Sequence, residues 1–381
     1  MAKSKKSETE SKTDFRSIFK TYASNNKNSK IEMMDEADLP NVDSFISTGC
    51  YSLNKILSGS YFKGIAHGRL TGIVGLPGVG KTYVCKNVIR EAQKVGYGVI
   101  VYDTENAYSV PDLLSAGIDV NQVGVVKINT INEWKTDIQN MLTKLHADHP
   151  DKKWLVVTDS LANLLTEKEI ADTEEGGTAQ DMGLRAKQYC AASRILQKTI
   201  ANCNAAMLIT NHSYEKPAQN PKIPPTEIPK GGNGFIYMVS YMLGIKKYSV
   251  KNEQKSAVDN STSKIKVGNR MVFTTMKNRF VPEGMTSEAF INFKEGLLPY
   301  QGLLEDAVKY GFIEASGSRW NIKHLDKLVW AKDLYTDEIW QPILPELDKK
   351  ISEELQYSVY GSATGNSAIP ETDNEPDEKG D

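Results

Sequence analysis

The sequence predicts an α/β protein with a mostly parallel central sheet, and three observations support that fold class. A glycine-rich segment at residues 75–82 lies between a strand-like and a helix-like stretch. Apolar runs typical of buried strands alternate with amphipathic helical patterns between residues 69 and 210. Acidic residues follow two of these runs, at the edge where an open parallel sheet keeps its ligand site.

The glycine-rich segment is a complete G-x-x-x-x-G-K-[ST] phosphate loop. Its residues are Gly75, Leu76, Pro77, Gly78, Val79, Gly80, Lys81 and Thr82. Glycines let successive backbone N–H groups point at one anion, beside the positive end of a helix. The apolar run at residues 69–74 and the helical face of Val84, Val88 and Ala92 supply the context that the motif requires. We therefore expect a bound nucleotide, with Lys81 at the β and γ phosphates and Thr82 holding Mg²⁺.

Three polar residues at strand ends are candidates for the rest of this site. Asp159, after the run at residues 154–158, fits the second nucleotide-site acid, which binds the Mg²⁺ shell through water. Glu105, after the run at residues 98–102, is the candidate that orients and deprotonates water for hydrolysis of a γ-phosphate. His212, after the strand that starts at Ala205, is placed to touch the γ-phosphate. For Glu105 and His212 the alternative is an ordinary polar residue at a strand end.

Two irregular segments flank a predicted helix that runs from about Gly183 to Ala201. The first, at about 170–182, has no periodicity, and the second, at 213–230, contains five prolines that forbid regular structure in its middle. On the helix, Lys187 and Arg194 lie two turns apart and share a face, about 10 Å apart along the axis. That spacing suits a nucleic-acid backbone, and a solvated basic face is the alternative.

Composition and charge narrow the class of protein. The chain has 381 residues, 40% of them hydrophobic and 25% charged, as in ordinary globular proteins. Its four cysteines show no C-x-x-C spacing, which favours a reducing interior and argues against structural zinc. No run approaches the roughly 18 apolar residues of a membrane span, and the hydrophilic N-terminus has no signal-peptide core. We expect a cytoplasmic protein with no membrane partner.

Both ends of the chain are polar and of opposite charge. Residues 1–30 carry eight Lys and Arg against three Asp and Glu, and residues 361–381 carry six Asp and Glu against Lys379. We expect mobile tails, with a role in solvation or, for the acidic tail, in competition with a polyanion for basic surface. Near the N-terminus, residues 15–22 place four apolar side chains on one helical face, which needs either a neighbouring subunit or the chain's own body as partner.

The order of these motifs resembles the RecA family of recombinases, over about residues 45–315. The matching segments are residues 46–53, the phosphate loop, 102–105, 156–160, 182–184, 210–212, 231–233 and 277–279. The details are most similar to the phage UvsX branch, notably residues 211–215 and 299–304. The resemblance implies a RecA-like phosphate-loop ATPase core at 46–300, with DNA-binding loops at about 170–182 and 213–230. A basic subunit-docking segment (1–45), a small helical domain (301–358) and an acidic disordered tail (359–381) would flank it.

The resemblance also implies roles for individual residues. Glu105 matches the catalytic glutamate, and Asp159 with Ser160 matches the second nucleotide motif. Lys277 and Arg279 match a basic pair that reaches into the ATP site of the neighbouring subunit. The matches to DNA contacts are Met182, Lys187, Arg194, Gly231, Gly232 and Asn233.

The chain also departs from the family pattern. His212 stands where cellular members have glutamine, and Asp112 stands where they stack a tyrosine on adenine, with Tyr108 and Pro282 as candidate substitutes. The second loop has no phenylalanine to wedge between bases, which leaves Ile223 or Ile228 for that role.

The resemblance implies the function of an ATP-dependent and Mg²⁺-dependent DNA recombinase. It would form homo-oligomeric filaments on single-stranded DNA, pair with double-stranded DNA, exchange strands and act as a DNA-dependent ATPase in recombination, repair and replication. A single-strand-binding protein and a recombination mediator are expected partners, in the host cell cytoplasm if the protein is of phage origin. The alternatives are a hexameric helicase motor and a non-exchanging, nucleotide-switched mediator.

Overall fold

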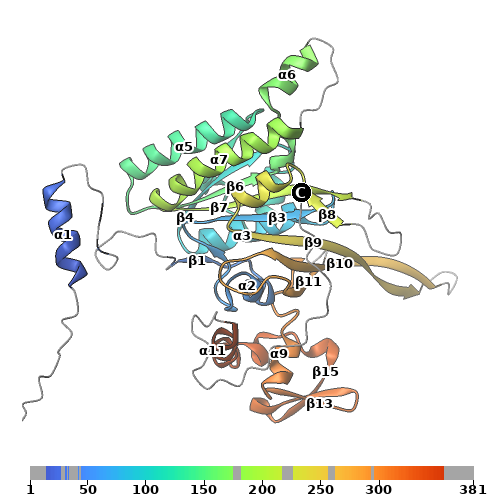
Figure 1. Ribbon diagram of the computed structural model, residues 1–381. Helices are drawn as coiled ribbons and strands as arrows, with labels where there is room; N and C mark the ends of the chain where they lie inside the picture. Colours follow the sequence, from blue (N-terminus) through green and yellow to red (C-terminus); the bar gives the residue numbers. More distant parts are fainter. Residues whose placement is uncertain are drawn as a thin grey trace, which may run out of the picture. The chain divides into compact units, whose positions relative to one another are not determined.

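The structure is a computed structural model, shown in Figure 1. It describes residues 14–26, 31, 33, 42, 44–174, 182–216, 226–255, 262–292 and 296–355. The chain divides into two compact units, residues 1–42 and 43–381, and each is described here by itself. In the described parts of the chain, none of the helices has the length and apolar character needed to cross a membrane.

The first unit contains the predicted amphipathic helix, α1 (Phe15–Asn25). Asp14 begins it, because its side chain accepts a hydrogen bond from the Ser17 backbone N–H at 3.4 Å. The apolar side chains Phe15, Ile18, Phe19 and Tyr22 are between 41% and 63% exposed. This exposed face has the composition of a buried surface. That it docks on a neighbouring subunit or on the chain's own body stays a prediction.

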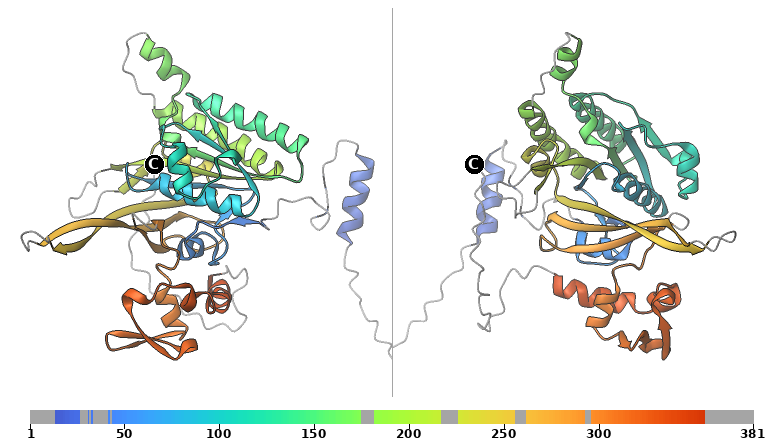
Figure 2. Two further views of the ribbon diagram at one scale, coloured as in Figure 1. Left: turned by 180° about the vertical axis from the view of Figure 1, so that it is seen from behind. Right: turned by 90° about the vertical axis from the view of Figure 1, so that its right-hand side faces the viewer.

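The second unit is built on a ten-stranded sheet of order β12-β11-β10-β9-β3-β7-β6-β4-β5, with β8 paired to β7. From β9 to β5 the neighbouring strands are parallel, and from β9 to β12 they are antiparallel. The strands are β3 (Leu70–Gly75), β4 (Tyr97–Asp103), β5 (Val123–Val126), β6 (Lys153–Asp159), β7 (Ala205–Lys216), β8 (Thr226–Pro229), β9 (Tyr241–Lys255), β10 (Thr262–Lys277), β11 (Thr286–Asn292) and β12 (Gly296–Leu297). The predicted α/β fold class is confirmed. Figure 2 shows β9 and β10 extending together as a long hairpin beyond the rest of the sheet.

Helices cover both faces of the parallel strands. In Figure 1, α5 and α7 lie on one side of the sheet and α3 lies on the other. Alternate strand residues such as Leu70, Val74 and Tyr102 pack with Trp134 of α5 and Leu196 of α7 in one buried core. The helices of this region are α2 (Tyr51–Ser58), α3 (Lys81–Lys94), α4 (Val110–Ser115), α5 (Ile131–Asp148), α6 (Glu167–Glu174), α7 (Met182–Asn202) and α8 (Asn233–Met238). The short strands β1 (Phe45–Ile46) and β2 (Ile65–Ala66) pair separately, and η1 (Val120–Gln122) and η2 (Leu161–Asn163) are single 3₁₀ turns.

The structure corrects the extent of both predicted loops. Residues 170–174 belong to α6, because Thr166 and Glu169 form a reciprocal cap that starts a helix before the loop. Residues 213–216 and 226–229 pair as the ends of β7 and β8, and prolines are tolerated in such an edge strand. The remaining loop residues, with Ile223 among them, lie outside the described residues.

The C-terminal segment also differs from the expected helical domain. It contains α9 (Leu304–Lys309), β13 (Ile313–Ser316), β14 (Arg319–Ile322), β15 (Lys327–Trp330), α10 (Asp337–Trp340) and α11 (Leu344–Leu355), with η3 (Lys323–Leu325) and η4 (Ala331–Asp333). The three strands form an antiparallel sheet. Gly317 and Asp326 have a left-handed backbone and reverse the chain at the two turns between these strands. Each strand has only four residues and is too short to show a clear alternating pattern in the sequence.

Buried polar contacts attach this segment to α2 and the residues after it. Asp306 accepts hydrogen bonds from Lys55 Nζ and Tyr61 Oη, both at 2.6 Å, and Asp348 accepts one from Ser60 Oγ at 2.8 Å. Asp306 is 9% exposed and Tyr61 is fully buried. The burial of the tyrosine and the neighbouring Asp306 carboxylate raise the pKa of Tyr61 above its usual range, so its hydroxyl stays a donor.

Asp306→Ala tests this attachment. The substitution leaves a buried hydroxyl and a largely buried ammonium without their shared acceptor, so we expect the free energy of unfolding to fall by about 3 kcal/mol. Urea unfolding followed by circular dichroism measures the loss. Lys309→Ala breaks the exposed Lys309–Glu354 pair and should cost about 1 kcal/mol or less. Equal losses in the two variants would contradict the assignment.

Candidate nucleotide site and nucleic-acid interface

The phosphate loop connects β3 to α3, as the motif predicts. Gly78 and Gly80 have φ values of 71° and 111°, a left-handed backbone that favours glycine. A Cβ atom at Gly80 would also lie 3.0 Å from the Met271 sulfur. Leu76, Pro77 and Gly78 are exposed, so the cradle of N–H groups opens toward solvent. This geometry fits a phosphate group held by the backbone at the start of α3.

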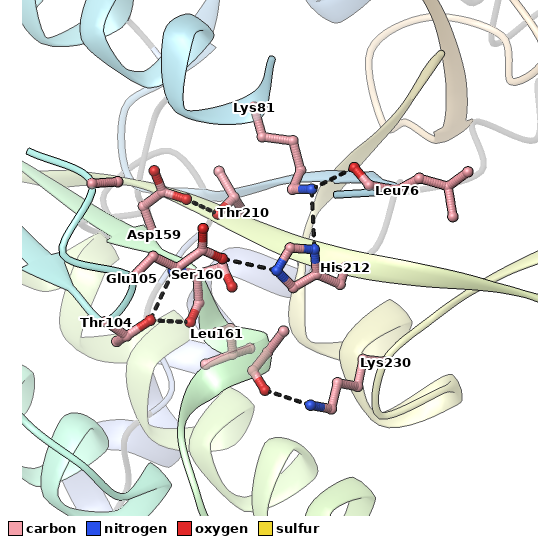
Figure 3. Close-up of polar contacts among 12 residues, drawn as sticks. Leu76, Lys81, Thr104, Glu105, Asp159, Ser160, Leu161, Thr210, His212 and Lys230 are labelled. Carbon is pink, nitrogen blue, oxygen red and sulfur yellow. Dashed lines mark hydrogen bonds and ion pairs between the residues drawn. The ribbon is translucent and has the colours of Figure 1, made fainter. Parts of the chain in front are cut away.

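Lys81 lies folded across the inside of the loop. Its ammonium donates to the carbonyls of Gly75 at 2.9 Å and Leu76 at 3.0 Å, and its Nζ is 3.3 Å from His212 Nδ1 (Figure 3). Burial lowers the pKa of Lys81, and the nearby Glu105 and Asp159 carboxylates oppose that shift. A phosphate in the loop would offer this ammonium a stronger, charge-assisted partner than the two carbonyls.

His212 joins Lys81 to Glu105. Because an ammonium can only donate, His212 Nδ1 accepts from Lys81, and Nε2 carries the proton donated to Glu105 Oε1 at 2.8 Å. This hydrogen bond is the main reason that the pKa of Glu105 is below its usual value. The carboxylate therefore stays ionised near neutral pH, in the form that a residue orienting water needs.

The turn after β4 brings Glu105 beside the end of β6. Thr104 Oγ1 donates to the Ser160 carbonyl at 2.7 Å and accepts from the Ser160 N–H at 2.9 Å. The Asp103 carboxylate accepts from the backbone N–H groups of Glu105, Ala107 and Tyr108 at 3.0–3.3 Å. Sequence reasoning gave no role to Asp103 or Thr104, although an aspartate followed by a turn is a known signal for such bonds.

Asp159 is 1% exposed, at the end of β6. Its Oδ1 accepts from Thr210 Oγ1 at 2.5 Å, and its Oδ2 accepts from Tyr108 Oη at 3.1 Å. Among the described residues no group of three or more His, Cys, Asp or Glu forms a protein metal cage. Mg²⁺ does not need one, because it binds through one or two protein oxygens together with nucleotide phosphates and water. Thr82 and Asp159 fit that donor set.

The predicted DNA contacts lie on α7 and around the start of α8. Lys187 and Arg194 are both exposed on α7. Gly231 and Gly232 have φ values of 85° and 53°, and a Cβ at Gly231 would lie 2.3 Å from the Tyr189 ring. A side chain at Gly231 would clash with this ring, and the left-handed backbone of both residues favours glycine. Asn233 is the first residue of α8 and Met182 is the first residue of α7. The side chain of Met182 lies outside the described part of the structure.

A cavity of about 560 Å³ lies between His212 and the glycines before α8. Its lining includes His212, Arg185, Lys230 and the glycines before α8. The Lys230 backbone N–H donates to the His212 carbonyl, and its Nζ donates to the Ala162 carbonyl, each at 2.8 Å. Arg185, 5% exposed, donates from Nη2 to both carboxylate oxygens of Glu169, each at 2.8 Å. Sequence reasoning missed Arg185 and Lys230, because their partners are distant along the chain.

Lys277 and Arg279 are not brought to the nucleotide cluster of their own chain. Lys277 Nζ donates to the carbonyls of Ile236 and Val239 at 2.8 Å, at the end of α8, and burial lowers its pKa. Arg279 is exposed. The expected role of this pair at the ATP site of a neighbouring subunit stays a prediction.

The structure also shows the surroundings of the residues considered for contacts with adenine and with DNA bases. Asp112 forms an ion pair with Lys86, and the Tyr108 hydroxyl is directed to Asp159. Pro282 is exposed, and Ile228 is partly buried in β8.

A phosphate loop beside a glutamate and an aspartate at the ends of adjacent parallel strands defines a phosphate-loop nucleotide-binding protein. Residues 14–296 match the RecA N-terminal domain, and the chain belongs to the RecA family. Protein RecA of Thermus aquaticus is 31% identical over 276 residues, 72% of this chain and 74% of that protein. Protein RecA of Clostridium acetobutylicum is 28% identical over 291 residues, 76% of each chain. Protein RecA of Chlamydia pneumoniae is 27% identical over 326 residues, 85% and 83% of the two chains.

His212→Ala tests the link to Glu105 without nucleotide. A carboxyl whose pKa is lowered on folding stabilises the protein above its unfolded pKa, and this contribution is lost as pH falls through the folded pKa. The free energy of unfolding should therefore fall when the pH is lowered from about 7 to about 3.5. We expect this fall to be about 1 kcal/mol smaller in His212→Ala than in the unmodified protein. Urea unfolding at both pH values measures it.

The control for that experiment is His324→Ala, which removes an exposed histidine whose ring faces the Glu338 carbonyl. This variant should keep the pH dependence of the unmodified protein. An identical pH dependence in His212→Ala and His324→Ala would show that the Glu105 bond contributes nothing.

Proposed function

We propose that the protein is an ATP-dependent DNA recombinase that polymerises on single-stranded DNA, pairs with duplex DNA and exchanges strands. The observation that carries the proposal is the position of His212. This residue contacts Lys81 and Glu105 on one side, and the same residue lines the cavity that contains Gly231, Gly232 and Asn233. Family membership supports the same conclusion. A nucleotide site and a DNA site that share a residue can influence each other.

The nucleotide half of the mechanism rests on the phosphate loop and the strand ends. Backbone N–H groups of residues 75–82 bind the phosphates, while Lys81 exchanges its two carbonyl partners for phosphate oxygens. Thr82 and Asp159 would hold Mg²⁺, which neutralises phosphate charge when it is bound. Glu105 orients and deprotonates the attacking water, and Ser160 is held beside it through Thr104.

The DNA half of the mechanism uses the backbone of the strand. Exposed Lys187 and Arg194 neutralise phosphates, and the glycines before Asn233 offer backbone N–H groups. The two loops around Met182 and before Lys230 complete the surface. Because such contacts read no bases, binding is expected to depend strongly on salt and little on sequence.

Assembly completes the ATP site in this proposal. Lys277 and Arg279 act on the nucleotide of the next subunit, and the apolar face of α1 docks on a neighbour. Hydrolysis and filament turnover are then coupled. The proposal further includes a relationship to the phage UvsX branch, work in the cytoplasm of a host cell, and cooperation with a single-strand-binding protein and a mediator.

Strand exchange between a single-stranded circle and homologous linear duplex tests the whole proposal. Joint molecules should form with ATP and Mg²⁺ and should be absent with heterologous duplex. Electron microscopy of the same mixtures should show filaments. Closed rings would instead identify a helicase motor, and DNA binding without pairing would identify a mediator.

Arg194→Ala tests the DNA surface. We expect weaker binding to single-stranded DNA and a salt dependence reduced by about one phosphate contact, with nucleotide binding retained. Fluorescence anisotropy over a range of salt concentrations measures both. Lys144→Ala, which removes an exposed cation from α5, is the matched control and should bind DNA as the unmodified protein does. Lys81→Ala, a change in the phosphate loop, should instead abolish ATP hydrolysis. Unchanged DNA affinity in Arg194→Ala would contradict the assignment of Arg194 to the DNA-binding surface.

A mixing experiment tests the shared ATP site. Glu105→Gln lacks the catalytic carboxylate, and Arg279→Ala lacks an exposed cation whose loss should not disturb folding. Each variant alone should have little DNA-stimulated ATPase activity. In an equimolar mixture, about a quarter of head-to-tail interfaces would combine an intact Glu105 with an intact Arg279, so activity should rise. A mixture no more active than the average of its parts would refute the shared site.

A further inference from the structure

The carboxylate of Asp159 is held from two sides by hydroxyl groups. Thr210 lies on β7, the strand next to β6, and its hydroxyl donates to Oδ1 at 2.5 Å. Tyr108 follows the turn after β4, the other neighbour of β6, and its hydroxyl donates to Oδ2 at 3.1 Å. Each carboxylate oxygen therefore has one fixed donor and keeps lone-pair capacity for one further partner.

The Tyr108 hydroxyl is a reliable donor at this position. The phenol hydroxyl carries a proton that it can donate, and an ionised carboxylate oxygen can only accept it. Thr210 is fully buried and has no solvent to compete for its hydroxyl. Both hydrogen bonds go to a charged acceptor, which makes them stronger than bonds between neutral groups.

The surroundings of Tyr108 fix its ring as well as its hydroxyl. Its backbone N–H donates to Asp103 Oδ2 at 3.2 Å, and Lys86 Nζ lies 5.6 Å from the ring centroid. Lys86 in turn forms an ion pair with Asp112. The tyrosine is thus held at its backbone, its ring face and its hydroxyl, and the hydroxyl is directed to Asp159.

We infer that Tyr108, with Thr210, is a positioning residue that fixes the Asp159 carboxylate before Mg²⁺ and nucleotide bind. A carboxylate with both oxygens fixed cannot rotate, so the lone pairs left for the Mg²⁺ shell keep one direction. This arrangement lowers the entropic cost of forming the metal site, as hydrogen-bonded partners of metal ligands do elsewhere. The inference rests on the proposed Mg²⁺–nucleotide site and is independent of DNA strand exchange.

Tyr108→Phe removes only the hydroxyl and tests the inference by binding. The full-length protein is titrated with a fluorescent ADP analogue at a series of Mg²⁺ concentrations, and again in the presence of EDTA. We expect the Mg²⁺ concentration for half-maximal binding to rise about tenfold, the usual effect of losing a partner of a metal ligand. Binding in EDTA should match that of the unmodified protein. Thr210→Val, a substitution of similar shape, should act in the same direction.

The matched control is Tyr97→Phe. Tyr97 is a buried tyrosine at the start of β4, and its hydroxyl lies 3.1 Å from His67 Nδ1, at the other end of the strand from Tyr108. This variant should lower the melting temperature without moving the Mg²⁺ requirement. If Tyr108→Phe likewise changes only the melting temperature, the inference is overturned.

The experiment separates this inference from the proposed function. Nucleotide binding by the unmodified protein that shows no dependence on Mg²⁺ would overturn both the metal site and the role of Tyr108. Normal Mg²⁺-dependent binding without any strand exchange would overturn the recombinase proposal alone. A raised Mg²⁺ requirement in both Tyr108→Phe and Thr210→Val, with Tyr97→Phe unchanged, supports the inference.

Discussion

The parallel register of four neighbouring strands is the constraint on which the candidate site depends. Pairing of β3 with β7, β7 with β6 and β6 with β4 brings their carboxyl ends to one edge of the sheet. Asp103 lies opposite Asp159, and Gly75 lies opposite His212. A shift of one residue in any pair would turn these side chains to the opposite face of the sheet. The buried apolar residues on both faces of the strands hold the register and therefore hold the site.

Charge balance shapes this edge of the sheet. The carboxylates of Glu105 and Asp159 favour the charged form of Lys81, and Lys81 favours the ionised form of Glu105; His212 lies between Lys81 and Glu105. A buried ammonium is costly to keep without partners, and here it has two carbonyls and an imidazole. Each of these partners interacts with the ammonium more weakly than a phosphate would, so an anion in the loop would replace them favourably.

The link between the two predicted sites consists of packed and hydrogen-bonded backbone. His212 and Lys230 are joined through main-chain atoms, and Lys230 directly precedes the glycines that lead into α8. At the other end of α8, Lys277 binds its last carbonyls. The helix is thus held at one end by residues tied to the nucleotide site and at the other by a residue proposed to reach the next subunit. In the proposed mechanism, α8 would link the ATP site, the DNA site and the contact with the next subunit.

The sequence by itself determined the α/β class, the phosphate loop, the strand ends with Glu105 and Asp159, and the helix with Lys187 and Arg194. These depend on local periodicity and on motifs whose spacing is fixed by the chain. The sheet within residues 313–330 was not predicted because its strands are short. The predicted loops were too long because a helix cap extends α6 into the first loop, and the pairing of β7 with β8 takes up both ends of the second. Only the tertiary structure decided that Tyr108 and Thr210 bind Asp159, that Arg185 pairs with Glu169 and that Lys277 lies at α8. Each of these contacts joins residues from separate elements, and their approach is set by how strands and helices pack, which no local pattern records.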